Sequence, residues 1–363
     1  MIFAINPTKD ASVYSADPTM NTGLDEVLEV SKVWTTATTR AITRALVQFD
    51  VTAFPLGTST VGNRKFFLKL YATEPENLQS NYTIQVLPVT ASWTMGSGKL
   101  FNTPATTEGV SWDFKNTLTT DTGSSEWWYA SASVGMHSLD NGGAYNASPF
   151  ATCTQSFTYT TADTNIDVTS MIEAWIAGTQ PNNGMLVMFG AGAEGIADTT
   201  SYGTLKFFSK DSNTVYKPKL ILKYDDSTRY VSASVAGTLN ADDTVVYIKG
   251  QKPQYAVGAI DKIRVIARDR FPVKTFSVTQ SQYISYNYLP TASYYGVKDA
   301  YTGEMVVDYD SQYGKVSSDE NGNFFTFNFG TLFVGRLYKF MLKVERGSLT
   351  QFFDTDTYFK VTR

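Results

Sequence analysis

The sequence predicts an all-β protein built from two β-sandwich domains, and three observations lead to this prediction. Aromatic residues make up 14% of the 363-residue chain and are mostly Tyr and Phe, which are common in strands. Short apolar or alternating segments recur along the chain, separated by clusters of Gly, Asn, Asp, Ser and Thr that favour turns. The length exceeds that of one ordinary sandwich domain, so we expect two domains.

The first domain is predicted over residues 1–224 as a jelly-roll-like sandwich with one short helix. Its clearest strand candidates mix alternation with apolar runs, as strands of a sandwich core do. They lie at 45–49, 66–71 and 83–87. The polar, Gly-rich stretch 96–143 is expected to form extended loops that cover one end or face of the sandwich.

A single helix is predicted over residues 167–178. Met171, Ile172, Trp175 and Ile176 fall on one apolar stripe, which predicts that they pack against a sheet. Asp167 or Thr169 can cap its start, and Gly178 suits its end because glycine adopts the left-handed conformation common there.

The second domain is predicted over residues 225–363 as an immunoglobulin-like sandwich, after a polar seam at 225–228. Its strand candidates lie at 244–249, 262–268, 324–329 and 338–344. The segment 320–323 contains Asn-Gly and predicts a hairpin turn. The last strand, 357–362, either completes this sandwich or pairs with the edge of a neighbouring chain.

Charge and hydropathy exclude several classes of protein. The net charge is -4 and no Lys/Arg cluster is present, which argues against nucleic-acid partners and anionic membranes. No apolar run is long enough to span a bilayer, so we expect no membrane insertion. The first residues lack a basic segment followed by an apolar one, so we expect synthesis in a host cytoplasm without a signal peptide. The single cysteine, Cys153, rules out an intrachain disulfide.

The sequence predicts that the protein is not an enzyme. His137 is the one histidine, so a Ser-His-Asp triad or a Cys-His pair with Cys153 would have to use it. The glycine-rich segment 190–195 lacks the following helix of a nucleotide-binding loop, and we interpret it as a flexible loop. Adjacent acids such as Asp25 and Glu26 would point to opposite faces of a strand and could not form a glycosidase pair.

Two sets of residues are candidates for binding. Trp112, Trp127, Trp128 and Tyr129 lie in the loop-rich stretch, where aromatic side chains either stack on a glycan or pack onto the sheet or an interface. Asp10, Asn21, Asp25 and Asp50 carry side-chain oxygens that could hold a structural calcium near a sandwich edge. No other cofactor is expected.

The first domain resembles the DNRLRE domain family, a group of β-sandwich modules related to carbohydrate-binding modules. The resemblance spans about residues 5–224 and rests on signals that occur in the family's order. They are KDASVY at 9–14 with NTG at 21–23, RALVQFDV at 44–51, FLKLY at 67–71, the helix at 167–178, and FSKD at 208–211 leading to PKLILKY at 218–224. The chain departs from the family at Lys210-Asp211, where a Glu is more usual.

The resemblance implies a rigid, non-catalytic module that binds glycans or connects other parts of an assembly. Such modules are common in phage structural proteins, so the first hypothesis is a tailed-phage virion component of the tail fibre, neck or baseplate. Its partners would be other virion proteins in an oligomeric or symmetric assembly, together with a host surface glycan. The alternative is a carbohydrate-binding module that attaches to a cell-surface or extracellular polysaccharide. Both expectations are analogies from the fold family.

Overall fold

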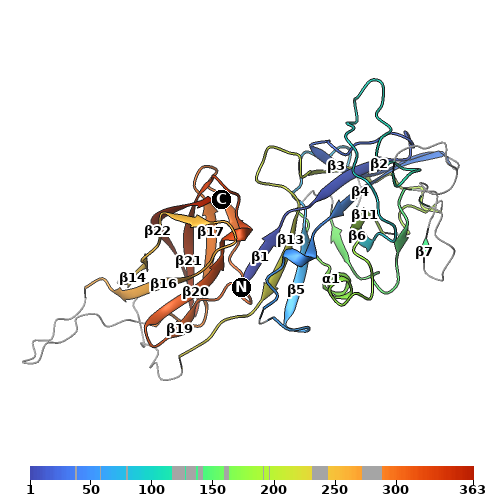
Figure 1. Ribbon diagram of the computed structural model, residues 1–363. Helices are drawn as coiled ribbons and strands as arrows, with labels where there is room; N and C mark the ends of the chain where they lie inside the picture. The colour runs from blue at the N-terminus through green and yellow to red at the C-terminus, as the bar shows by residue number, and fades with distance from the viewer. Residues whose placement is uncertain are drawn as a thin grey trace, which may run out of the picture. The chain divides into compact units, whose positions relative to one another are not determined.

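The computed structural model describes residues 1–36, 39–57, 59–78, 81–116, 127, 136–137, 142–158, 163–190, 192–195, 197–230, 244–271 and 288–363. The chain forms two compact units. The N-terminal unit comprises Ile5–Gly57 and Lys65–Ile221, and the C-terminal unit comprises Met1–Ala4, residues 58–64 and Leu222–Arg363. Both units consist of packed sheets, which confirms the predicted all-β sandwich class (Figure 1).

The larger sheet of the N-terminal unit has the strand order β12-β3-β4-β11-β6-β9, with β2 also paired to β4. Strand β11 lies between β4 and β6 and is buried at all five positions, whereas β9 forms an edge. The strands are β2 (Lys9–Tyr14), β3 (Val27–Thr36), β4 (Thr39–Gln48), β6 (Tyr82–Pro88), β9 (Thr154–Phe157), β11 (Met185–Phe189) and β12 (Gly203–Phe208).

A four-stranded sheet has the order β1-β13-β5-β10. Its strands are β1 (Ile2–Ile5), β13 (Lys219–Tyr224), β5 (Arg64–Lys69) and β10 (Ile166–Asp167). The alternation in β5 buries Phe66 and Leu68 completely and leaves the residues between them half-buried, as a strand with one face toward a core requires. A small sheet pairs β7 (Met136–His137) with β8 (Tyr145–Asn146).

The predicted helix is present as α1 (Thr169–Ile176), beside β5 (Figure 1). Its apolar stripe buries Met171, Ile172 and Trp175, which confirms core packing for this tryptophan. The Asp167 carboxylate accepts a hydrogen bond from the Thr169 backbone at 2.9 Å, and Gly178 has a φ of +71° just after the helix. No helix in the described part of the chain is long and apolar enough to cross a membrane.

The C-terminal unit contains a four-stranded and a five-stranded sheet, with the orders β14-β16-β20-β19 and β15-β22-β21-β17-β18. In the first, the strands are β14 (Thr244–Lys249), β16 (Ile260–Asp269), β19 (Ser317–Asp319) and β20 (Gly322–Asn328). In the second, they are β15 (Gln254–Ala256), β17 (Ser293–Asp299), β18 (Met305–Val307), β21 (Leu337–Arg346) and β22 (Leu349–Thr362).

Aromatic rings from both sheets meet in the core of the C-terminal unit. Tyr295 of β17 stacks on Phe325 of β20 with ring centroids 4.4 Å apart. Phe327 of β20 meets Phe340 of β21 edge-on at 5.4 Å, and Phe359 of β22 stacks on Phe340 at 4.6 Å. Side chains in 324–329 and 338–344 alternate between the two faces of their strands, as predicted. This alternation brings the rings onto the facing sides of the two sheets.

Two further expectations for this unit can be compared with the structure. The Asn-Gly segment at 320–323 forms the turn between β19 and β20, and Gly322 has a φ of +107°. Strand β22 lies between β21 and β15, so it completes the sheet of its own chain. Pairing of residues 357–362 with a neighbouring chain stays a prediction.

The carboxyl group of Asp10, in the N-terminal unit, is buried, which is unusual for an acidic side chain. Asp10 of β2 has 1% of its surface exposed, and its carboxylate accepts a hydrogen bond from the Lys210 backbone at 2.7 Å. Burial raises the pKa of Asp10 to about 7, with the neighbouring Asp211 adding to the shift and the Lys210 backbone opposing it.

We predict that this carboxyl makes the stability of the protein depend on pH. Because its folded pKa exceeds its unfolded value, stability is fully present below about pH 4 and falls as the pH rises toward about 7. Asp10→Asn removes this titration, so the variant should gain roughly 1–4 kcal/mol over the wild type between pH 5 and pH 8. Urea unfolding of both proteins at several pH values measures the difference, and parallel pH profiles would contradict the prediction.

Candidate functional site

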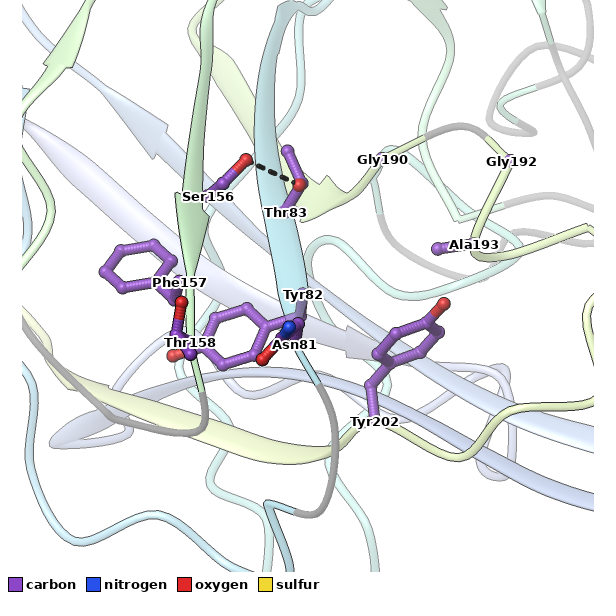
Figure 2. Close-up of a pocket in the computed structure, with 10 residues that line it drawn as sticks. All are labelled: Asn81, Tyr82, Thr83, Ser156, Phe157, Thr158, Gly190, Gly192, Ala193 and Tyr202. Atoms are coloured by element: carbon purple, nitrogen blue, oxygen red, sulfur yellow. Dashed lines mark hydrogen bonds between the residues drawn. The ribbon is translucent and has the colours of Figure 1, made fainter.

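An open pocket lies at the edge of the larger sheet of the N-terminal unit. It has a volume of about 500 Å³, within the range of sites that hold small ligands. Strands β6 and β9 form one side of it, and the segment between β11 and β12 forms the other (Figure 2). The lining consists of Asn81, Tyr82, Thr83, Ser156, Phe157, Thr158, Gly190, Gly192, Ala193 and Tyr202.

Three aromatic residues of the lining form a chain of ring contacts with the buried Phe189. Tyr82 and Phe157 are direct cross-strand partners, and their rings stack with centroids 5.0 Å apart. Tyr82 also meets Phe189, the buried last residue of β11, at 6.0 Å, and Phe189 lies 5.1 Å from Tyr202. Figure 2 shows the rings of Phe157, Tyr82 and Tyr202 along the pocket.

Polar groups line the exposed side of the pocket. Thr83 and Ser156 are the next cross-strand pair, and their hydroxyl oxygens lie 2.9 Å apart in a hydrogen bond (Figure 2). Because successive residues of a strand point to opposite faces, these hydroxyls lie on the other face of the two strands from the buried Tyr82 and Phe157 rings. Asn81 and Thr158 are exposed and add an amide and a third hydroxyl. With the partly exposed ring of Tyr202, these groups can contact the C–H surface of a sugar and hydrogen-bond its hydroxyls.

The ionisation of the tyrosines is set by their surroundings. Burial raises the pKa of Tyr82 to about 12, and burial together with a hydrogen bond to Asp198 raises the pKa of Tyr202. The Tyr202 hydroxyl donates to Asp198 Oδ2 at 2.6 Å. Partial burial alone would raise the pKa of Asp198, but the hydrogen bonds from Tyr202 and Thr200 outweigh it and lower that pKa to about 2. At neutral pH the phenols are therefore neutral and Asp198 is ionised.

A buried ion pair holds the pocket loop, defined here as residues 190, 192–195 and 197–202. Arg44 of β4 contacts Glu194 through Nε at 2.9 Å and Nη2 at 2.8 Å, and both side chains are almost fully buried. Glu194 also accepts a hydrogen bond from the Phe189 backbone at 3.2 Å. Burial raises the pKa of Glu194, and the adjacent guanidinium opposes that shift. The pair thus links the loop to the centre of the sheet.

A second buried cation holds the same loop from the neighbouring strand. The Lys32 side chain of β3 is fully buried, and its Nζ donates to the backbone carbonyls of Ala193 and, at 2.6 Å, Asp198. The Asp198 carboxylate lies 3.7 Å from the same nitrogen. Burial lowers the pKa of Lys32, while Asp198 opposes that shift. Lys32 of β3 and Arg44 of β4, on adjacent strands, therefore fix the positions of Ala193 and Tyr202.

The tryptophans that were candidates for glycan contact or for packing are buried where the structure describes them. Trp112 is buried beneath Gly142, and the Arg44 guanidinium lies 5.0 Å from its ring. Trp127 is 1% exposed and donates from Nε1 to the Ser111 carbonyl at 2.9 Å. Both follow the packing alternative, and neither lines the pocket. Trp128 and Tyr129 lie outside the described residues, so their role stays a prediction.

The residues proposed for calcium are each engaged in local structure. Asn21 is buried, donates to the carbonyls of Met95 and Val110, and accepts from Gly98 and Gly23. Asp25 accepts from the Leu100 backbone, Asp50 caps the short 3-10 turn η1 (Val51–Ala53), and Asp10 accepts from Lys210. Among the described residues no group of three or more His, Cys, Asp or Glu side chains could hold a metal ion.

The other candidates for chemistry can be placed as well. Cys153 is buried, and burial raises the pKa of its thiol. His137 lies in β7. The strand at 83–87 and the loop at 190–195 were both recognised from sequence, yet nothing in the sequence indicated that they meet. Tyr82, Phe157 and Tyr202 were missed for that reason, since their contact depends on strand pairing across more than 70 residues.

Comparisons with known proteins give one informative match. Residues 1–132 match the model of carbohydrate-binding module family 96. No curated protein matches the chain. A solved structure of Bacteroides uniformis beta-glucuronidase 2 covalently bound to cyclophellitol-6-carboxylate aziridine is 8% identical with a TM-score of 0.18, covering 98% of this chain. The chain spans about a third (32%) of that protein's chain. The virion role and its assembly partners stay predictions.

We predict that removing one member of the Arg44–Glu194 pair strongly destabilises the N-terminal unit. Glu194→Ala leaves a buried guanidinium without its carboxylate and should cost roughly 3–5 kcal/mol of unfolding free energy. The double variant Arg44→Met/Glu194→Leu removes both charges and should recover most of that loss. Chemical denaturation compares the three proteins. Equal losses in the single and double variants would show that the charge pairing is unimportant.

Proposed function

We propose that the protein is a carbohydrate-binding protein that attaches to a polysaccharide through the pocket between β6, β9 and the pocket loop. The observation that carries this proposal is the lining itself, which offers the partly exposed ring of Tyr202 together with neutral polar groups from Asn81, Thr83, Ser156 and Thr158. Sugars present the same two surfaces, an apolar C–H face and a rim of hydroxyls.

The match to carbohydrate-binding module family 96 supports the proposal independently of the pocket. The matched segment, residues 1–132, contributes Asn81, Tyr82 and Thr83 to the lining. The remaining lining residues come from later in the chain, so the site is completed only when β9 and the pocket loop are in place.

The pocket suits attachment better than catalysis. Its described lining offers hydroxyls, an amide and rings, but no carboxylate pair of the kind that glycoside hydrolysis uses. The two acids of the pocket loop are engaged elsewhere, Glu194 with Arg44 and Asp198 with Tyr202 and Thr200. We therefore propose binding without turnover.

We predict that filling the pocket abolishes polysaccharide retention. Ser156 is exposed on the edge strand, so Ser156→Trp should place an indole over the cavity without disturbing the core. Affinity gel electrophoresis across a panel of polysaccharides should show at least about a tenfold loss of affinity, which corresponds to about 1.4 kcal/mol.

The control is Ser92→Trp, which changes another exposed serine of the N-terminal unit, beyond the far end of β6. It should melt at the same temperature as Ser156→Trp and keep the affinity of the wild type. Retention that is equal in both variants would refute the pocket as the binding site, and no retention by the wild type on any polysaccharide would refute glycan binding.

A further inference from the structure

We infer that the five-stranded sheet of the C-terminal unit carries a second contact surface for a polysaccharide. This inference rests on the proposed function, because it assigns a further site to the same class of ligand. The surface lies on the side of β22, β21 and β17 away from the core, and these strands are neighbours in the sheet (Figure 1). It is called the outer face here and is defined by Tyr309, Lys339, Met341, Lys343, Phe352 and Tyr358.

The strand register brings lysines and rings together on this face. Lys339 and Lys343 alternate along β21 with buried core residues, so their side chains point away from the core. On β22, Tyr358 is the cross-strand partner of Lys339, and Phe352 is the partner of Lys343. Tyr358 is 49% exposed and Phe352 is 60% exposed. Two adjacent strands therefore present two exposed rings, each beside a lysine.

A glycine in β17 makes room for a third ring. Gly296 is the cross-strand partner of Met341, and a Cβ atom at Gly296 would lie 2.5 Å from Met305 Cε and 3.2 Å from Tyr309 Cε1. The absence of a side chain thus lets Met305 and Tyr309 lie close over the strand. The Tyr309 ring reaches the Phe352 ring, with centroids 5.6 Å apart. Burial raises the pKa of Tyr309 to about 12, so its phenol is neutral at pH 7.

The charged groups between the rings are paired with one another. Lys339 Nζ donates to the Asp354 carboxylate and lies 5.8 Å from the centroid of the Tyr358 ring. Lys343 Nζ lies 2.6 Å from Glu345 Oε1. The four charged side chains are between 13% and 39% exposed. An ammonium has three donors and a carboxylate has several acceptor sites, so each pair can also bond a hydroxyl group of a ligand.

This mixture of rings and ion pairs suits a sugar chain better than a protein partner. The middle of a protein interface is depleted of Lys, Asp and Glu, and a protein that covered the outer face would remove water from both ion pairs. Sugar units offer C–H faces that pack on rings and hydroxyls that bond charged groups. A chain that holds a polysaccharide both here and at the pocket gains apparent affinity, because the second contact forms at high local concentration.

The full-length variant Phe352→Ala/Tyr358→Ala tests the outer face. Affinity electrophoresis would use glucan, mannan, xylan, galactan, alginate, polygalacturonate and hyaluronan. Calorimetry would use a tetrasaccharide made from the polysaccharide that retains the wild type most strongly. We expect the affinity for that polysaccharide to fall by at least about threefold, because one of two linked contacts is lost. The affinity for the tetrasaccharide should stay within about twofold of the wild type, because the pocket that binds it more tightly is unchanged.

Two further variants serve as controls. Tyr247→Ala/Ile260→Ala removes side chains that are 38% and 54% exposed on the other sheet of this unit, and it should bind the polysaccharide as the wild type does. Phe352→Tyr/Tyr358→Phe keeps both rings and should also keep the wild-type affinity. Because the changed side chains are exposed, all three variants should melt at the wild-type temperature.

The outcomes separate the outer face from the pocket. Wild-type affinity in Phe352→Ala/Tyr358→Ala, an equal loss in Tyr247→Ala/Ile260→Ala, or an equal loss for the tetrasaccharide would overturn the second surface and leave the pocket proposal standing. Self-association of the wild type that Phe352→Ala/Tyr358→Ala removes, with unchanged glycan affinity, would show a protein contact instead. Affinity that Ser156→Trp does not change but Phe352→Ala/Tyr358→Ala lowers would refute the pocket and support the outer face. No retention of the wild type on any polysaccharide would overturn both.

Discussion

The candidate site depends on one buried ion pair, between Arg44 in the middle of the larger sheet and Glu194 in the pocket loop. Burying both charges is acceptable only because each neutralises the other and Glu194 also accepts a backbone hydrogen bond. Arg44 donates in addition to the Gly142 carbonyl at 3.1 Å and lies over the ring of Trp112. One guanidinium thereby contacts the pocket loop, Gly142 and Trp112, which are separated along the sequence.

Lys32 extends this arrangement from the adjacent strand and explains why the pocket wall is neutral. Its contacts with Ala193 and Asp198 hold the backbone of the pocket loop, and Asp198 in turn orients the Tyr202 hydroxyl. These charged groups therefore hold the loop from the interior, and the side chains that the loop contributes to the described pocket lining, Ala193 and Tyr202, are uncharged.

Aromatic packing stabilises the core of the C-terminal unit. Its core is a set of interlocked aromatic rings contributed by both sheets, among them Tyr295, Phe327 and Phe340. Rings of this size bury much apolar surface at few positions, which suits short strands with polar outer faces. Strand β22 lies between β15 and β21 in its sheet and completes the fold of this unit.

The sequence by itself determined the β class, the position of α1, the hairpin turn at Gly322 and most of the strands, because these follow from local periodicity and turn chemistry. The sequence also placed Arg44 in a strand motif, but no local pattern explained a charged residue at that position. The tertiary structure decided that Trp112 and Trp127 are interior residues and that Tyr82, Phe157 and Tyr202 form the pocket. Long-range strand pairing and the Arg44–Glu194 pair decide which aromatic rings are buried and which edge strand meets a distant loop. Neither of these interactions leaves a local pattern in the sequence, so the sequence alone could not predict them.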